Sequence, residues 1–183
     1  TETVGGKKVP GYDQQHNGCD VFVVKLNSEG TRLEYATFLG GKSTDICMAL
    51  GTDNLGCAYV GGRTSSSDFS MTETVGGKKV PGYDQQHNGD YCDAFIVKLN
   101  SEGTKLVYAT FFGGEGDDTC NTIIIGIQGC VYLGGQTASS DFPMTESMGG
   151  KKALGYDQTY NDNELNSSLS CLFSGDAYVI KLT

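Results

Sequence analysis

The sequence lacks any apolar run of about 18 residues, the length that a helix needs to cross a bilayer, so it predicts no membrane span. Positive charge is also scarce, because 13 Lys and Arg stand against 22 Asp and Glu, which gives a formal net charge of −9. An acidic surface repels phosphate backbones, so nucleic acid is not an expected partner. Tryptophan is absent, proline occurs 3 times, and hydrophobic residues make up 38%. This content favours thin strands joined by glycine-rich turns over a single thick core.

One segment of the chain occurs twice. The letters TETVGGKKVPGYDQQHNG span residues 1–18 and return at residues 72–89. The segments that follow, residues 20–41 and 93–114, are identical at 17 of 22 positions. A third, partial copy ends in DAYVIKLT at residues 176–183, and the period is 71 to 73 residues. Self-similarity at a fixed period predicts a repeat architecture.

Each repeat unit carries four strand signals and no helical periodicity, which predicts an all-β fold. A hairpin turn is expected at residues 100–103, where Gly103 supplies the positive φ. Four short antiparallel strands followed by a long Gly/Ser/Asp-rich link are typical of a propeller blade. The expected strands are residues 20–27, 32–39, 46–52 and 57–64, then 93–100, 105–112, 119–127 and 130–137.

Two stretches of the second repeat carry a family likeness. They are DAFIVKLNSEGTKLVYATFFGGEGDD and GCVYLGGQTASSDFPMT, and together they resemble the SBBP repeat, a seven-bladed β-propeller repeat. The resemblance implies that residues 119–127 form the innermost blade strand, A, and residues 130–137 form strand B. Residues of the 93–100 and 105–112 type would then be strands C and D. The strand order along the chain becomes C-D, A-B-C-D, A-B-C.

This order implies an incomplete ring of about two and a quarter β-propeller blades, each a four-stranded antiparallel repeat. Residues 1–41 would be half a blade (the B–C loop plus strands C and D), and residues 42–114 a complete blade. Residues 115–183 would lack the outer strand and carry an inserted loop at 162–175. Open ends expose unpaired backbone groups, so we expect head-to-tail contact with further copies, or with missing blades of a longer chain.

The last strand of the sequence is the segment that we expect to lie in a neighbouring sheet during such assembly. Its side chains alternate along the strand, as expected for an extended segment that pairs at an edge. The candidate assembly residues are Asp176, Tyr178, Ile180 and Leu182.

Five of the seven cysteines map to one rim of the blade that the resemblance implies. Cys47 and Cys120 open strand A, whereas Cys19 and Cys92 precede strand C. This mapping implies disulfides Cys47–Cys92 and Cys120–Cys171, and leaves Cys19 free or joined across a blade or chain boundary. Disulfides would place the protein outside the cell or on its surface. The alternative is that all four paired residues are reduced thiols.

The other cysteines and the two histidines carry no pattern typical of a metal or catalytic site. Cys57 and Cys130 begin strand B, where we expect buried free thiols. No CxxC pair is present, and His16 and His87 lie in the duplicated loop without an adjacent nucleophile. The sequence therefore predicts no metal, no cofactor and no catalytic residue.

Aspartates in the turns allow two interpretations. Asp117 and Asp118 follow a Gly-Gly pair, and Asp68 and Asp141 each follow two serines. Oxygen-rich loops of this kind bind calcium in some proteins, but Asp and Ser side chains also cap turns. The first repeat unit has Ser and Thr in place of Gly116-Asp117, which favours turn capping.

Three tyrosines and one asparagine suggest contact with sugars. Tyr12, Tyr83 and Tyr156 recur in each GYDQ segment, where they would stack on carbohydrate rings or pin their own loops. Asn166 begins the only N-x-[ST] sequon and is a candidate glycosylation site in a secreted protein.

These observations predict a non-enzymatic, extracellular structural or interaction module of propeller repeats. We expect it to assemble head to tail with further copies, for example as a fibre or a surface layer. The alternative is a fragment of a carbohydrate-binding propeller, with glycans as partners.

Overall fold

The computed structural model describes residues 3–4, 7–11, 13–69, 74–75, 78–79, 82, 84–143, 147–148, 151–152 and 175–182. Over these residues every regular element is a β-strand, apart from one short 3-10 helix at Ile127–Gly129. All pairings between strands are antiparallel. The all-β class expected from the sequence is therefore confirmed.

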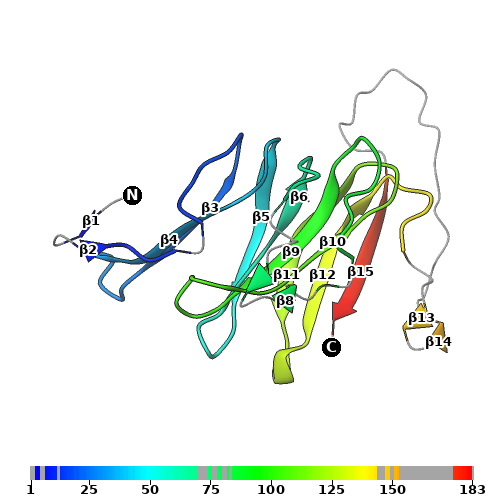
Figure 1. Cartoon of the computed structure of the whole chain (residues 1–183). Helices are drawn as coiled ribbons and strands as arrows, with labels where there is room; N and C mark the ends of the chain where they lie inside the picture. The colour runs from blue at the N-terminus through cyan, green and yellow to red at the C-terminus, as the bar shows by residue number, and fades with distance from the viewer. Residues whose placement is uncertain are drawn as a thin grey trace, which may run out of the picture.

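Three sheets lie side by side along the molecule, in the order of the chain (Figure 1). In the first sheet β3 pairs with β4, the central sheet has the order β10-β9-β6-β5, and the third sheet has the order β11-β12-β15. Over the described residues the sheets form an open stack and do not close into a ring. The strands are β3 (Val21–Leu26), β4 (Leu33–Leu39), β5 (Asp45–Thr52), β6 (Ala58–Thr64), β9 (Asp93–Leu99), β10 (Leu106–Phe112), β11 (Asp118–Ile125), β12 (Val131–Thr137) and β15 (Asp176–Leu182).

Each copy of the repeated segment also contains one pair of two-residue strands, which gives three such pairs. Each pair forms its own small antiparallel ladder next to a Gly-Gly step. They are β1 (Thr3–Val4) with β2 (Lys7–Lys8), β7 (Thr74–Val75) with β8 (Lys78–Lys79), and β13 (Ser147–Met148) with β14 (Lys151–Lys152).

The hairpin turns are built as the sequence predicts. Gly103 has a φ of 63°, and its N–H donates to the Asn100 carbonyl at 2.9 Å. The Asn100 side-chain oxygen accepts from the N–H groups of Thr104 and Lys105 at 2.8 and 2.9 Å. Gly30, with a φ of 68°, closes the equivalent turn of the first sheet. Asparagine and glycine therefore specify this turn in both units.

The duplicated loop covers the outer edge of β4 and of β10. The Pro10 carbonyl accepts from the Ala36 N–H, and the Asp13 carbonyl accepts from the Phe38 N–H, both at 3.0 Å. The Asp84 carbonyl makes the equivalent bond to the Phe111 N–H at 3.0 Å. An uncovered strand edge is a template for unwanted pairing, so these bonds protect the outer edges from edge-to-edge aggregation.

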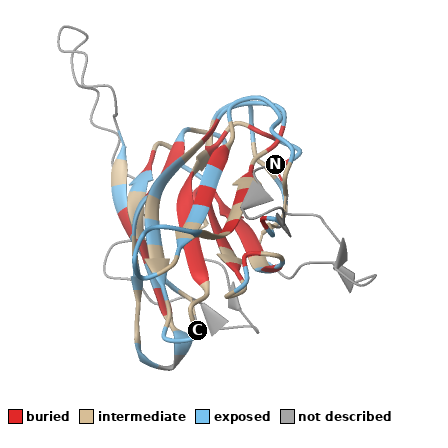
Figure 2. Cartoon of the chain, turned by 90° about the vertical axis from the view of Figure 1, so that its left-hand side faces the viewer, coloured by how far each residue is buried: buried red, intermediate tan, exposed pale blue. Residues whose placement is uncertain are grey.

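The hydrophobic core consists of two apolar layers, one on each side of the central sheet. Figure 2 shows the buried positions concentrated on the strands, while much of the connecting chain is exposed. The layer between the first and central sheets contains Val21, Val23, Tyr35, Leu39, Phe69, Phe95, Val97 and Leu99. The layer between the central and third sheets contains Tyr59, Ala94, Ile96, Phe112, Cys120, Val131, Leu133 and Tyr178.

Glycines on β6 allow the central and third sheets to approach closely. A Cβ atom on Gly61 would lie 2.9 Å from both Cys120 Sγ and Ile123 Cδ1 of β11. A Cβ atom on Gly62 would collide with the Ile46 carbonyl, next to a bulge in β5. Gly61 therefore serves packing between sheets, whereas Gly62 allows the close approach of β5 within the central sheet, and both are established reasons for glycine inside a strand.

We predict that equivalent phenylalanines of two repeat units differ sharply in their contribution to stability. Phe95→Ala should lower the free energy of unfolding by about 3–5 kcal/mol, because the ring is fully buried and leaves a cavity. Phe22→Ala, its counterpart on the exposed face of β3, should lower it by less than about 1 kcal/mol. Urea unfolding followed by circular dichroism measures both values. Equal losses would contradict this core assignment, and Phe95→Leu serves as the milder variant if Phe95→Ala does not fold.

Candidate functional site

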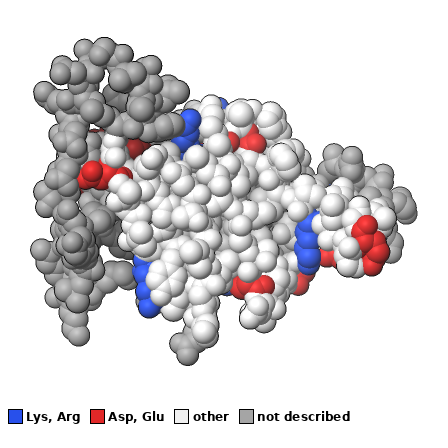
Figure 3. Space-filling model, turned by 180° about the vertical axis from the view of Figure 1, so that it is seen from behind, with Lys and Arg blue, Asp and Glu red and all other residues white. Residues whose placement is uncertain are grey.

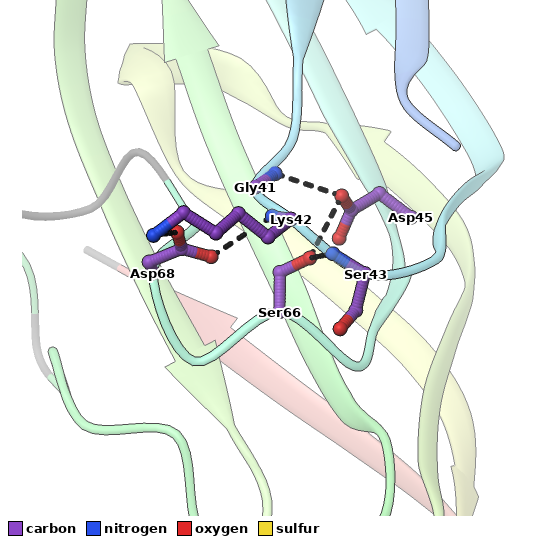
Figure 4. Close-up of polar contacts among 6 residues, drawn as sticks. All are labelled: Gly41, Lys42, Ser43, Asp45, Ser66 and Asp68. Atoms are coloured by element: carbon purple, nitrogen blue, oxygen red, sulfur yellow. Dashed lines mark hydrogen bonds and ion pairs between the residues drawn. The ribbon is translucent and has the colours of Figure 1, made fainter. Parts of the chain in front are cut away.

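A polar network joins the loop after β4 to the loop after β6. Asp45, the first residue of β5, accepts from the Gly41 N–H at 2.9 Å and from the Ser66 hydroxyl at 3.0 Å. The Thr64 hydroxyl donates to the other oxygen of Asp45. Ser66 Oγ in turn accepts from the Ser43 N–H at 3.0 Å (Figure 4). One carboxylate and one hydroxyl therefore fix two loops that are more than 20 residues apart in sequence.

The second repeat unit builds the same network from equivalent residues. Asp118 accepts from the Gly114 N–H at 2.9 Å and from the Ser139 hydroxyl at 2.7 Å. Ser139 Oγ accepts from the Gly116 N–H at 2.8 Å. A Cβ atom on Gly114 would collide with the carboxylate of Asp141, so glycine is required where the two loops meet.

A second aspartate in each network anchors the neighbouring loop, but its charge partner differs between the copies. Asp68 accepts from the Lys42 N–H at 2.9 Å and forms an ion pair with Lys42 Nζ at 3.2 Å. Asp141 accepts from the Glu115 N–H at 2.9 Å. Because glutamate replaces lysine, the second network is the more acidic one. The ion pair at Lys42 lies on the surface, so it adds little stability.

Asp93, the first residue of β9, is a buried carboxyl group beside the second network. Its Oδ2 accepts from the Asn88 N–H at 2.8 Å, while no group donates to Oδ1. Burial raises the pKa of Asp93, the bond from Asn88 lowers it and the nearby charge of Asp118 raises it, which together give a pKa of about 7. Burial also raises the pKa of Asp118 itself. Asp20 repeats this arrangement in the first unit, where the Asn17 N–H donates to its Oδ2 at 2.8 Å.

A polar cavity of about 370 Å³ opens over the second network. Its described lining combines carboxylate and amide side chains, and it contains no aromatic ring among the described residues. The side chains that give the cavity its polarity are Asp84, Gln86, Asn88 and Asp141.

The structure differs from the predicted Cys47–Cys92 disulfide, because both residues are free thiols. Strands β5 and β9 are not neighbours, since β6 lies between them. Two strand spacings amount to about 9.6 Å, whereas the Cα atoms of a disulfide are less than about 7 Å apart. Cys92 Sγ instead lies 3.1 Å from the Ser65 hydroxyl.

The other cysteines that the structure describes are also free thiols. Cys120 is buried against the central sheet, and burial raises its thiol pKa to about 11. Its predicted partner, Cys171, lies outside the described residues. Cys19 is an exposed thiol, whereas Cys57 and Cys130, expected to be buried, are only partly buried.

Strand β15 forms part of the chain's own third sheet, where it pairs with β12. Tyr178 is buried there and donates from its hydroxyl to the Thr119 carbonyl at 2.8 Å. Ile180 and Leu182 pack against the same core layer. These candidate assembly side chains therefore face the central sheet, and the other face of β15 presents Val179.

The remaining predicted residues have structural surroundings or lie outside the described part of the chain. His87 Nε2 lies 3.2 Å from the Thr64 carbonyl, and its ring meets Phe111 edge-on at 5.9 Å. His16 meets Phe38 in the same way at 5.7 Å. The three GYDQ tyrosines and the candidate glycosylation site Asn166 lie outside the described residues.

The aspartate networks are suited to holding loops, since most of their oxygens accept hydrogen bonds from the chain itself. Among the described residues no three His, Cys, Asp or Glu side chains converge into a metal-binding group. Asp68, Asp118 and Asp141 each accept backbone N–H bonds, as the turn-capping interpretation predicts. Asp45 and Asp93 were not predicted from the sequence, although an aspartate recurs at both positions in the other repeat unit.

Neither the protein-family models nor the curated proteins contain a match to this chain.

We predict that Asp93 makes the fold less stable at neutral and alkaline pH. An aspartate in an unfolded chain has a pKa of about 3.9, so the folded state keeps a proton that the unfolded state has lost. Its contribution to stability is therefore complete below about pH 4 and declines as the pH rises towards about 7. Asp93→Asn should raise the free energy of unfolding at pH 8 by on the order of 2 kcal/mol, with little change at pH 4.

Thermal unfolding of both forms between pH 4 and pH 8 measures this difference. Asp90→Asn, an exposed substitution in the adjoining loop, is the matched control and should follow the wild type. A pH profile for Asp93→Asn that is parallel to the wild type would show that Asp93 does not carry the effect.

Proposed function

We propose that the chain is a non-enzymatic structural and interaction module of propeller-type repeats, which assembles head to tail through the faces of its end sheets. The described central sheet supports the blade interpretation, because its four strands follow one another in the order A-B-C-D. The stacking of sheets in chain order supports it as well. We propose, on the same grounds, that the repeat units are of the SBBP type that their sequence resembles.

The observation that carries this proposal is the exposure of apolar side chains at one end of the stack. Phe22, Val24 and Leu26 on β3 are 71%, 42% and 51% exposed. Their counterparts on β9 are 0% exposed, since the first sheet covers them. The three counterparts are Phe95, Val97 and Leu99. The outer face of β3 therefore has the composition of an interface between sheets but no described sheet on it.

The other end of the stack shows the same contrast. Val179 on β15 is 76% exposed, whereas its counterpart Ile96 is fully buried by the third sheet. Tyr132 on β12 is 38% exposed, and its counterpart Tyr59 is 1% exposed. The two end faces thus correspond to the two sides of the sheet contact already present inside the chain. Exposed apolar patches of this kind are typical of protein interaction sites.

The expected strength of such a contact is moderate. Each buried aliphatic or aromatic side chain contributes about 1.5–3 kcal/mol, so five of them contribute on the order of 10 kcal/mol. Association itself costs about 4–15 kcal/mol. The net gain is then at most about 6 kcal/mol, so self-association should be observable from tens of micromolar to millimolar concentration.

On the side shown in Figure 3, charged side chains lie around the margin and the middle is uncharged. No helix in the described part of the chain is long and apolar enough to cross a membrane. An extracellular or cell-surface location is part of the proposal, but it would follow only from disulfides, and the described cysteines are free thiols.

Carbohydrate binding is the second candidate function. The polar cavity beside Asp84 and Asp141 supplies the carboxylate and amide groups that bind sugar hydroxyls. Its described lining offers no ring for stacking, so the assembly proposal has the stronger support.

We predict that the native mass rises with protein concentration and that two single-face variants complement each other. Val24→Lys blocks the β3 face, and Val179→Lys blocks the β15 face, so each variant alone should remain a monomer of about 19 kDa. An equimolar mixture should form a dimer, because each variant keeps the face that the other has lost. Sedimentation or light scattering from about 10 μM to 1 mM measures these masses.

Leu55→Lys is the matched control, because Leu55 is also exposed but lies in the turn between β5 and β6. It should assemble like the wild type. A wild type that stays monomeric up to millimolar concentration would sink the proposal. Assembly of either single-face variant alone would exclude the head-to-tail arrangement.

A further inference from the structure

The first sheet carries an open apolar groove on its outer face. It has a volume of about 390 Å³ and lies between the duplicated loop and the strands β3 and β4. Volumes of this size, about 300–1,000 Å³, are typical of ligand pockets. Its apolar lining consists of Val9, Phe22, Val24, Leu33, Ala36 and Phe38.

The equivalent place on the central sheet is filled by a phenylalanine from the chain itself. Phe69 lies 4.7 Å from Phe95 and 6.3 Å from Phe111, measured between ring centroids. Phe95 and Phe111 are the counterparts of Phe22 and Phe38 in the groove. The ring of Phe69 is fully buried in the core layer.

The third sheet repeats this arrangement. Phe142 stacks on Tyr178 with a centroid distance of 4.7 Å and an interplanar angle of 30°. Tyr178 occupies the position of Phe22 and Phe95 in its own unit. Two of the three sheets therefore receive a phenylalanine on the same face.

The same short segment supplies both inserted rings. Phe69 and Phe142 each end a Ser-Ser-Asp-Phe sequence, in which the Phe N–H donates to the first serine carbonyl at 3.1 and 3.2 Å. The chain contains this sequence only twice, and both rings are buried in their own units. No described phenylalanine of this type is left to fill the groove beside Phe22.

We propose that this groove binds the phenylalanine side chain of a Ser-Ser-Asp-Phe segment supplied by another polypeptide chain of the same repeat type. The partner's ring would lie against Phe22 and Phe38, as Phe69 lies against Phe95 and Phe111. The inference goes beyond the proposed function, because a further copy of this chain keeps both of its Ser-Ser-Asp-Phe rings buried and does not supply one. It shares with the proposed function only the face of β3. A short peptide tests it without any self-association of the chain.

The experiment is a titration of the full chain, at a concentration where it is monomeric, with a synthetic nonapeptide. The probe is TASSDFPMT, which copies residues 137–145, and the control peptide has alanine at the phenylalanine position. Methyl resonances of Val24, Leu33 and Ala36 in the groove should shift with the probe. The control peptide should bind at least tenfold more weakly, because it lacks the ring.

Variants of the chain locate the binding. Ala36→Leu fills the groove from its lining and should abolish the shifts, and Phe22→Ala should weaken binding by about tenfold. Leu55→Ala, an exposed apolar change far along the chain, should bind like the wild type.

Each result decides the question. Equal binding of both peptides, shifts outside the groove, unchanged binding by Ala36→Leu, or no shift at about 5 mM peptide would overturn the inference. Peptide binding by a chain that never self-associates would keep this inference and sink head-to-tail assembly. Self-association without peptide binding would do the reverse.

Discussion

The rest of the structure depends on the need to cover both faces of a thin sheet. Side chains of a strand alternate between faces, and on β9 both sets are apolar, with Phe95 and Val97 on one face and Ile96 on the other. Neither face is stable in water, so the central sheet folds only with a neighbour on each side. The outermost sheets of the stack also have apolar outer faces that need a cover, and there Phe22 and Val179 remain exposed.

The stack also needs a fixed register, and polar groups at the loops provide it. The Cys19 carbonyl accepts from the Asp45 N–H, and the Cys92 carbonyl from the Asp118 N–H, both at 2.7 Å. In each case the residue before the third strand of one unit is tied to the first strand of the next unit. The aspartate side chains then fix the following loop. Burying a charged carboxylate costs free energy, and for this reason burial raises the pKa of Asp93. The stability of the stack should therefore depend on pH.

The strands, the Asn-Ser-Glu-Gly hairpin turns and the strand order of the central sheet could be predicted from the sequence, whereas contacts between side chains of different sheets could not. The Cys47–Cys92 pairing is not supported, because the expected order A-B-C-D already places strand B between strands A and C. Alternate strands of an antiparallel sheet are parallel without being adjacent. Asp93 was missed because an aspartate at the start of a strand also fits an ordinary turn. Its burial follows from the packing of the next unit.

The duplicated loop explains why growth of the stack should proceed through faces and not through edges. Backbone carbonyls of Pro10, Asp13 and Asp84 occupy N–H groups on the outer edges of β4 and β10, where another strand would otherwise pair. The described parts of the two identical loop copies make equivalent contacts in both units, as the matching bonds from the Phe38 and Phe111 N–H groups show. With the edges of β4 and β10 occupied, the apolar end faces are the larger surfaces for specific association, while β3 and β15 each keep an edge that pairs with no described strand. Face stacking requires matching side chains, so it selects partners of the same repeat type, whereas pairing at a bare edge would accept almost any extended strand.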